Sequence, residues 1–118
     1  MTIYEKQDYD TPMFTITMDT YQSKAMTTRL ASAGEEYALL GLVGEVGEFF
    51  SLIAKAVRDG EQDDYREMAK KELGDILWFI AALAEDHGYT LGEIAEGNLT
   101  KLAKRKAAKT LQGSGDNR

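Results

Sequence analysis

The sequence contains no cysteine, one histidine and one proline among its 118 residues. Without cysteine the chain cannot form a disulfide, a thiolate metal site or a Cys nucleophile. The single histidine, His87, stands at the end of an expected helix. This excludes a Ser-His-Asp arrangement and argues against a di-iron bundle, which uses Glu-x-x-His on two helices. The only proline, Pro12, lies near the start, so everything after it is free to be helical.

The sequence also lacks long apolar runs and an excess of basic residues. No uninterrupted apolar run approaches the ~18 residues of a membrane span, and the first ten residues are too polar for a signal peptide. The net charge of −6 disfavours binding to the phosphate backbone of nucleic acids. No Gly-x-x-x-x-Gly-Lys-Ser/Thr loop is present, so a P-loop enzyme is excluded. We therefore expect a cytoplasmic protein without a membrane segment and without stable nucleic-acid binding.

Helix signals follow one another from residue 18 onward. The spacing of a capping box marks three helix starts, and glycine marks two helix ends. The starts are Ser32/Glu35, Asp64/Glu67 and Thr90/Glu93, and the ends are Gly60 and His87-Gly88. With the apolar periodicity, these signals predict an all-α fold, an antiparallel four-helix bundle with short joints. The expected helices are about 18–31, 33–59, 64–87 and 91–109. The expected organisation is an N-terminal segment 1–17, one helical domain 18–109 and a disordered tail 110–118.

Two acidic pairs, Glu45/Glu48 and Glu72/Asp75, stand in the middle of expected helices among apolar residues. The i, i+3 spacing places both carboxylates of a pair on one helix face. Half-buried carboxylates are costly unless a positive charge lies between them. Two neighbouring helices can therefore supply four oxygen ligands to a divalent cation. Mg²⁺ is the natural ion, since it prefers hard oxygen ligands and bridges to phosphates, with Mn²⁺ as a substitute. The alternative is a structural salt-bridge network.

Cations on expected helices suggest a polyphosphate ligand. Lys55 falls on the face of Glu48, and Asn98, Lys101 and Arg105 share one stripe of the last helix. Positive side chains that face a metal site on an acidic protein are what a polyphosphate requires. The basic residues of the last helix also complement the helix dipole, and this alternative stays open.

Aromatic and amide side chains give further candidates for contact with a substrate. Trp78 and Phe79 follow Asp75 within one turn, so each either packs in the core or stacks on a nucleobase. Tyr21 and Gln22 of the first helix are candidates for the same cavity, with core packing and a surface amide as the alternatives.

At these residues the sequence resembles the MazG-like proteins of the all-α nucleoside triphosphate pyrophosphohydrolase superfamily. The family pattern is an E-x-x-E motif, a loop and an E-x-x-D motif on the next helix, here residues 45–48 and 72–75. The resemblance spans about residues 18–106, and Tyr21-Gln22 is similar to short stand-alone members of phages and bacteria. Many members carry a further acid directly before the first motif, where this chain has Gly44.

The resemblance implies a Mg²⁺-dependent enzyme that converts a (d)NTP into a (d)NMP and pyrophosphate. A metal-bound water, deprotonated with help from a carboxylate, would attack the α-phosphorus. The implied metal ligands and catalytic residues are Glu45, Glu48, Glu72 and Asp75. The implied substrate contacts are Lys55, Asn98, Lys101, Arg105, Trp78, Phe79 and Gln22. The family also implies a homodimer or homotetramer with a cleft built from two subunits. The alternative functions are a non-catalytic nucleotide or metal sensor and a structural helical module.

Overall fold

The computed structural model describes residues 16–109, 112–113 and 115. Its helices are α1 (Met18–Met26), α2 (Glu35–Asp59), α3 (Tyr65–Asp86) and α4 (Leu91–Ala107), and this part of the chain contains no strand. The predicted all-α fold with four helices is thereby confirmed. Most of the predicted N-terminal segment 1–17 and of the predicted tail 110–118 lies outside the described residues.

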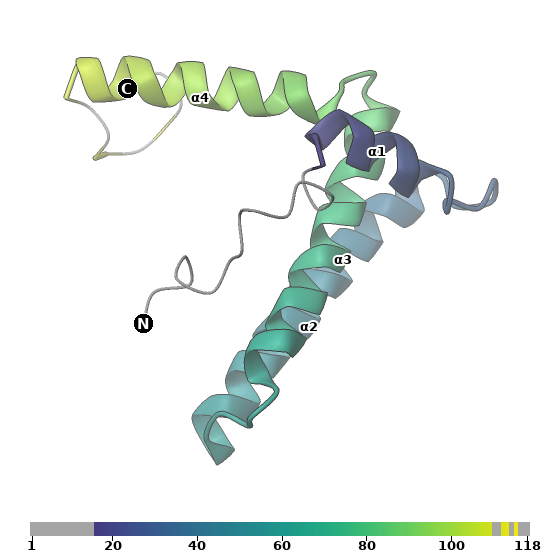
Figure 1. The fold of residues 1–118 in the computed structure, drawn as a ribbon, viewed down its shortest axis with the longest axis vertical. Coiled ribbons are helices and arrows are strands. Elements are labelled where there is room, and N and C mark those ends of the chain that lie inside the picture. Colours follow the sequence, from purple (N-terminus) through teal and green to yellow (C-terminus); the bar gives the residue numbers. More distant parts are fainter. Residues whose placement is uncertain (1–15, 110–111, 114, 116–118) are drawn as a thin grey trace.

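The long antiparallel hairpin of α2 and α3 is the main body of the structure (Figure 1). α1 packs against α3 and α4 at the end of the hairpin where α2 begins and α3 ends. α4 runs crosswise to the hairpin and makes no contact with α2. Within one chain, therefore, the fourth helix does not complete a compact bundle alongside the other three.

The helix ends agree with the prediction where glycine or a capping box is present. Gly60 and Gly88 have φ of 86° and 76°, the left-handed region that favours glycine. Thr90 Oγ1 accepts from the amide of Glu93 at 3.0 Å, and the Glu93 carboxylate accepts from the amide of Thr90 at 3.2 Å. The capping box predicted at the start of the last helix is thus confirmed.

Two predicted capping boxes and one predicted helix end were wrong, although α2 and α3 begin within two residues of the predicted starts. α2 begins after Gly34, without a side-chain cap, so Ser32 does not form the expected capping box. Asp64 precedes α3 but likewise makes no capping hydrogen bond. α1 ends at Met26 rather than at residue 31. Directly after Met26, the hydroxyls of Thr27 and Thr28 donate to the carbonyls three residues earlier, at 2.6 Å each. Such bonds compete with helical ones and turn the chain out of the helix.

The close approach of α2 and α3 depends on Gly41. A Cβ atom built at Gly41 would lie 2.2 Å from Cε1 of the buried Phe79 ring, whereas one at Gly44 meets nothing within 4 Å. Phe79 and its buried neighbours Ala38 and Ala82 form the core between the two helices. The glycine therefore allows the ring to pack directly on the α2 backbone.

We expect Gly41→Ala and Gly44→Ala to change stability in opposite directions. Gly41→Ala forces Phe79 to move, and such overpacking costs about 1–3 kcal/mol. Gly44→Ala removes a helix-interior glycine without a clash, which stabilises by about 0.5–1 kcal/mol. Urea unfolding at one protein concentration measures both free energies, and a Gly41→Ala variant at least as stable as the wild type would contradict the packing described.

Much of the apolar surface of α2 is exposed within one chain. Leu40, Val43, Phe50 and Val57 are between 62 and 82% exposed, on the side turned away from α3. By length and mean hydropathy (1.5 over 18 residues) α2 is also apolar enough to cross a membrane. Core helices of soluble proteins pass the same test but are mostly buried, whereas this window is 6% buried within one chain. This qualifies the expectation from the sequence, which considered uninterrupted apolar runs only. Every such window of α2 contains the charged pair Glu45/Glu48.

Candidate metal centre

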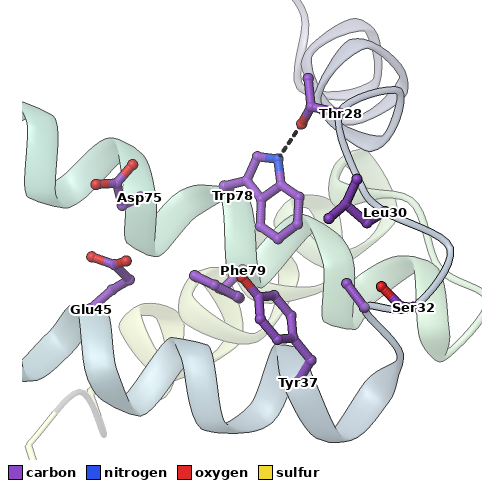
Figure 2. Close-up of a pocket in the computed structure, with 9 residues that line it drawn as sticks. Thr28, Leu30, Ser32, Tyr37, Glu45, Asp75, Trp78 and Phe79 are labelled. Carbon is purple, nitrogen blue, oxygen red and sulfur yellow. Dashed lines mark hydrogen bonds between the residues drawn. The ribbon is translucent and has the colours of Figure 1, made fainter.

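Three of the four predicted carboxylates converge midway along the hairpin. Glu45 comes from α2, and Glu72 and Asp75 come from α3; one oxygen from each lies within 4.8 Å of the other two. Glu72 and Asp75 share one face of α3 because they are three residues apart. Figure 2 shows Glu45 and Asp75 facing each other between the two helices. The spacing of the motifs on two antiparallel helices thus places acids from both on one seam.

Glu48 lies outside this group of three. It follows Glu45 by one turn of α2 and is exposed. Its charge is still near enough to contribute to the raised pKa of Glu45. A role for Glu48 as a fourth ligand stays a prediction.

The environment of Glu45 opposes its negative charge. Its pKa is raised by partial burial and then by the charges of Asp75, Glu72 and Glu48, with a hydrogen bond to Glu72 acting in the same direction. Burial and the charge of Asp75 also raise the pKa of Tyr21. A divalent cation would relieve this repulsion. The donors are all carboxylate oxygens, a set that fits Mg²⁺ or Mn²⁺ and offers no nitrogen or sulfur ligand.

The raised pKa gives metal-free stability a defined pH dependence. The folded-state pKa of Glu45 lies above the ordinary 4.5. The folded protein therefore binds the proton of the Glu45 carboxyl group more tightly than the unfolded chain does. The resulting stability is complete below pH 4.5 and is lost as the pH rises through the raised value. Glu45→Gln should therefore raise the Tm of the metal-free protein at pH 7 by about 2–5 °C, as expected for a partly exposed charge.

The change at Glu45 should lose its effect as the pH falls toward 4.5, and Mg²⁺ should reverse the order of the Tm values at pH 7. The wild type then gains stability from the bound ion, and Glu45→Gln gains little. Scanning calorimetry with and without Mg²⁺ measures both effects. The control is Glu67→Gln, an exposed position on α3. If metal-free Glu45→Gln has a lower Tm than the wild type at pH 7, the charge of Glu45 does not destabilise the folded protein, and the prediction is wrong.

A cavity of about 440 Å³ opens beside the carboxylates. Glu45 and Asp75 lie at one end, and the rings of Tyr37, Trp78 and Phe79 form the walls further along (Figure 2). Its volume is in the range of small-molecule sites, about 300–1,000 Å³. Trp78, for which the sequence left core packing and stacking on a nucleobase open, lines the cavity. Phe79 is buried in the core and touches the cavity as well.

The indole ring of Trp78 is fixed in orientation. Its Nε1 donates to Thr28 Oγ1 at 2.9 Å and to the carbonyl of Ala25 at 3.2 Å. Phe79 packs edge-on against it with ring centroids 5.0 Å apart. Tyr37 completes the aromatic wall, 5.7 Å from Phe79. Tyr37 was missed in the sequence, although its spacing of four residues from Gly41 and eight from Glu45 places all three on neighbouring parts of one face.

Gln22 has a structural role in place of the predicted contact with substrate. Its side chain is buried, and its Nε2 donates to Glu85 at 3.1 Å and to the carbonyl of Tyr89 at 3.0 Å. Its Oε1 accepts from the amide of Leu91 at 2.7 Å. Both ends of the amide are therefore engaged in holding α1 against the turn between α3 and α4.

The structure does not bring the predicted phosphate-binding residues to the carboxylates of the same chain. Lys55 lies about 15 Å along α2 from Glu45 and lines a separate hollow of about 180 Å³ with Asp59 and Tyr65. Asn98, Lys101 and Arg105 belong to α4, which does not touch α2. Arg105 is buried, and its Nη2 donates to the carbonyl of Gly115 at 3.2 Å. Their contact with a substrate stays a prediction.

Comparisons with known proteins agree on one group of relatives. A family model described as the MazG nucleotide pyrophosphohydrolase domain matches residues 33–109. Gene 37 protein of Mycobacterium phage L5 is 36% identical over 112 residues, which cover 86% of this chain and 98% of the phage protein. The crystal structure of iMazG from Vibrio DAT 722 matches with a TM-score of 0.58 and 26% identity, over 78% of this chain and 97% of the other. The matched segment 33–109 contains both acidic motifs.

Proposed function

Because the chain belongs to the MazG nucleotide pyrophosphohydrolase family, we propose that it hydrolyses nucleoside triphosphates to monophosphates and pyrophosphate with Mg²⁺. The observation that carries the proposal is the convergence of Glu45, Glu72 and Asp75 at one end of a cavity with aromatic walls. Hard oxygen ligands suit the metal that accompanies a triphosphate. A neutral aromatic wall suits a base, which every nucleotide carries.

The roles proposed for the residues follow from their positions. Glu45, Glu72 and Asp75 would hold Mg²⁺, or Mn²⁺ as a substitute, with the exposed Glu48 as the predicted fourth ligand. When bound, the ion polarises the phosphates and lowers the pKa of a water for attack on the α-phosphorus. Trp78, held by its Nε1, lines the cavity with its ring (Figure 2) and would stack on a nucleobase there. These carboxylates and this ring bind and orient the substrate, which is most of what phosphoryl chemistry needs from a protein.

We further propose that a second copy of the chain covers the exposed apolar face of α2. The side chains that define this face are Leu40, Val43, Phe50 and Val57. Gly47 and Ala54 lie between them and permit close approach of another helix. An exposed apolar patch of this kind marks an interaction surface. A homodimer, or a homotetramer built from it, also gives Lys55, Asn98, Lys101 and Arg105 a route to the phosphates of a substrate held by the other subunit. We place this assembly in the cytoplasm.

The test is a panel of dNTPs, NTPs and modified nucleotides with Mg²⁺ in ¹⁸O-labelled water. The proposal predicts release of pyrophosphate, with the label in the monophosphate because attack occurs at the α-phosphorus. Asp75→Asn and removal of Mg²⁺ by EDTA are expected to abolish the release. The alternative function is a sensor that binds the nucleotide without turnover. Saturable nucleotide binding with no pyrophosphate from any substrate would support that alternative.

A further inference from the structure

The connection between α1 and α2, residues 27–34, forms one wall of the cavity beside the carboxylates. Thr28, Leu30, Ser32 and Ala33 line the cavity from this side (Figure 2). None of the four is charged, so this wall does not neutralise the charge of the phosphates that the carboxylates would bind through a metal. The hydroxyl of Ser32 makes no hydrogen bond within the described part of the chain and is available to the polar edge of a ligand.

Arg29 fastens this connection to α3 without lining the cavity itself. Its Nη1 and Nη2 donate to the two carboxylate oxygens of Asp86, at 2.9 Å each. Its Nε donates to the carbonyl of Ala33 at 2.7 Å, and its Nη1 reaches the carbonyl of Ala82 at 3.3 Å. The side chains of Arg29 and Asp86 are only 13% and 18% exposed. A two-pronged bond of this kind fixes geometry as well as distance, so one side chain ties both ends of the connection to the helix behind it.

A second bond links the connection to the aromatic wall. The Thr28 hydroxyl accepts from Trp78 Nε1 and donates to the carbonyl of Ala25 at 2.6 Å. The orientation of the Trp78 ring and the position of the connection are therefore coupled. A shift of residues 27–34 would alter the width of the cavity and the angle of the ring at the same time.

We propose that residues 27–34 are the wall that recognises the base of the nucleotide, and that Arg29, through Asp86, is the positioning residue that holds this wall. This inference rests on the proposed function. It specifies that residues 27–34 contact the base of the nucleotide and not its phosphates. The carboxylates of the metal site lie on α2 and α3, and none of them bonds to Arg29. Loss of the Arg29 bonds should therefore weaken binding of the base and leave binding of the phosphates unchanged.

The experiment compares two probes in the full chain with Mg²⁺. One is a non-hydrolysable α,β-imido nucleotide of the preferred base, and the other is inorganic tripolyphosphate, which has no base. For Arg29→Ala we expect an increase of about tenfold in the nucleotide Kd, as is typical for damaged pocket contacts. The Kd of tripolyphosphate should change less than about twofold, because its metal-dependent contacts remain. With the hydrolysable nucleotide, KM should rise while kcat stays near the wild-type value.

Conservative variants keep the test informative if Arg29→Ala does not fold. Arg29→Lys retains the charge opposite Asp86 but loses the two-pronged bond, so it should restore part of the nucleotide affinity. Asp86→Asn should resemble Arg29→Lys. The matched control is Arg58→Ala, which breaks another two-pronged Arg–Asp pair that is exposed and far along the hairpin, and it should alter neither Kd.

Two results would overturn the inference alone. They are an equal loss of affinity for nucleotide and tripolyphosphate, and a folded Arg29→Ala variant whose nucleotide Kd is unchanged. In both cases hydrolysis by the wild type would still support the proposed function. A wild type that binds neither probe would overturn the proposed function and the inference together.

Discussion

Replacing Glu72 by Gln is expected to lower the kcat of Mg²⁺-dependent pyrophosphate release about 10²- to 10⁴-fold. The amide keeps the size of the side chain but removes one of three charges that meet within 4.8 Å. Metal affinity should fall with it, because the remaining two carboxylates hold the ion less tightly. Mn²⁺ titration followed by electron paramagnetic resonance measures affinity, and pyrophosphate release measures the rate.

The matched control for Glu72→Gln is Glu67→Gln, the same change at an exposed position of the same helix. It should leave both quantities within about twofold, as surface substitutions usually do. Glu48→Gln is informative in a different way, since Glu48 is exposed and outside the group of three. A loss at Glu48 as large as that at Glu72 would mean that Glu48 joins the ligands when metal binds. An active Glu72→Gln variant would remove the basis for the proposed site.

Replacing Val43 by Glu is expected to convert the oligomer into monomers. Val43 is 72% exposed within one chain and lies in the middle of the apolar face of α2. In a two-fold symmetric interface each substitution occurs twice, so two unpaired carboxylates would be buried. At several kcal/mol for each uncompensated charge, the dimer Kd should rise at least about 10³-fold.

Light scattering coupled to gel filtration measures the mass of the Val43→Glu variant. Pyrophosphate release should fall too, because Lys55, Lys101 and Arg105 would no longer reach a neighbouring site. Ser23→Glu places the same charge at an exposed position of α1 and should leave the mass unchanged. A wild type that is monomeric at micromolar concentration, or a fully active monomeric variant, would contradict the proposed assembly.

The hairpin and its acidic seam were predictable because local signals specify them. The motifs at 45–48 and 72–75 stand on long helices joined by a turn that begins at Gly60, a glycine with positive φ. Antiparallel neighbours then bring the two motifs to the same level. Thr90 with Glu93 marked the start of α4 for the same reason, since a capping box involves only residues within one turn.

The parts that could not be predicted depend on partners distant in sequence. Arg29 bonds to Asp86, which lies 57 residues later in the sequence. Gln22 bonds to the amide of Leu91, which lies 69 residues later. No periodicity or spacing reveals such pairs, so the cavity wall was missed and Gln22 was assigned to substrate. The direction of α4 likewise goes with its packing on α1, which lies far earlier in the sequence. In the proposed assembly, the position of Lys101 and Arg105 relative to a substrate depends on the second subunit.

The most direct test is a crystal structure with Mn²⁺ and a non-hydrolysable α,β-imido nucleotide, with anomalous data collected at the Mn absorption edge. We expect an anomalous peak bounded by Glu45, Glu72 and Asp75, with the phosphates beside it and the base against the ring of Trp78. A peak at any other position with these three carboxylates facing solvent, or a bound nucleotide with no metal among them, would contradict the assignment of the site.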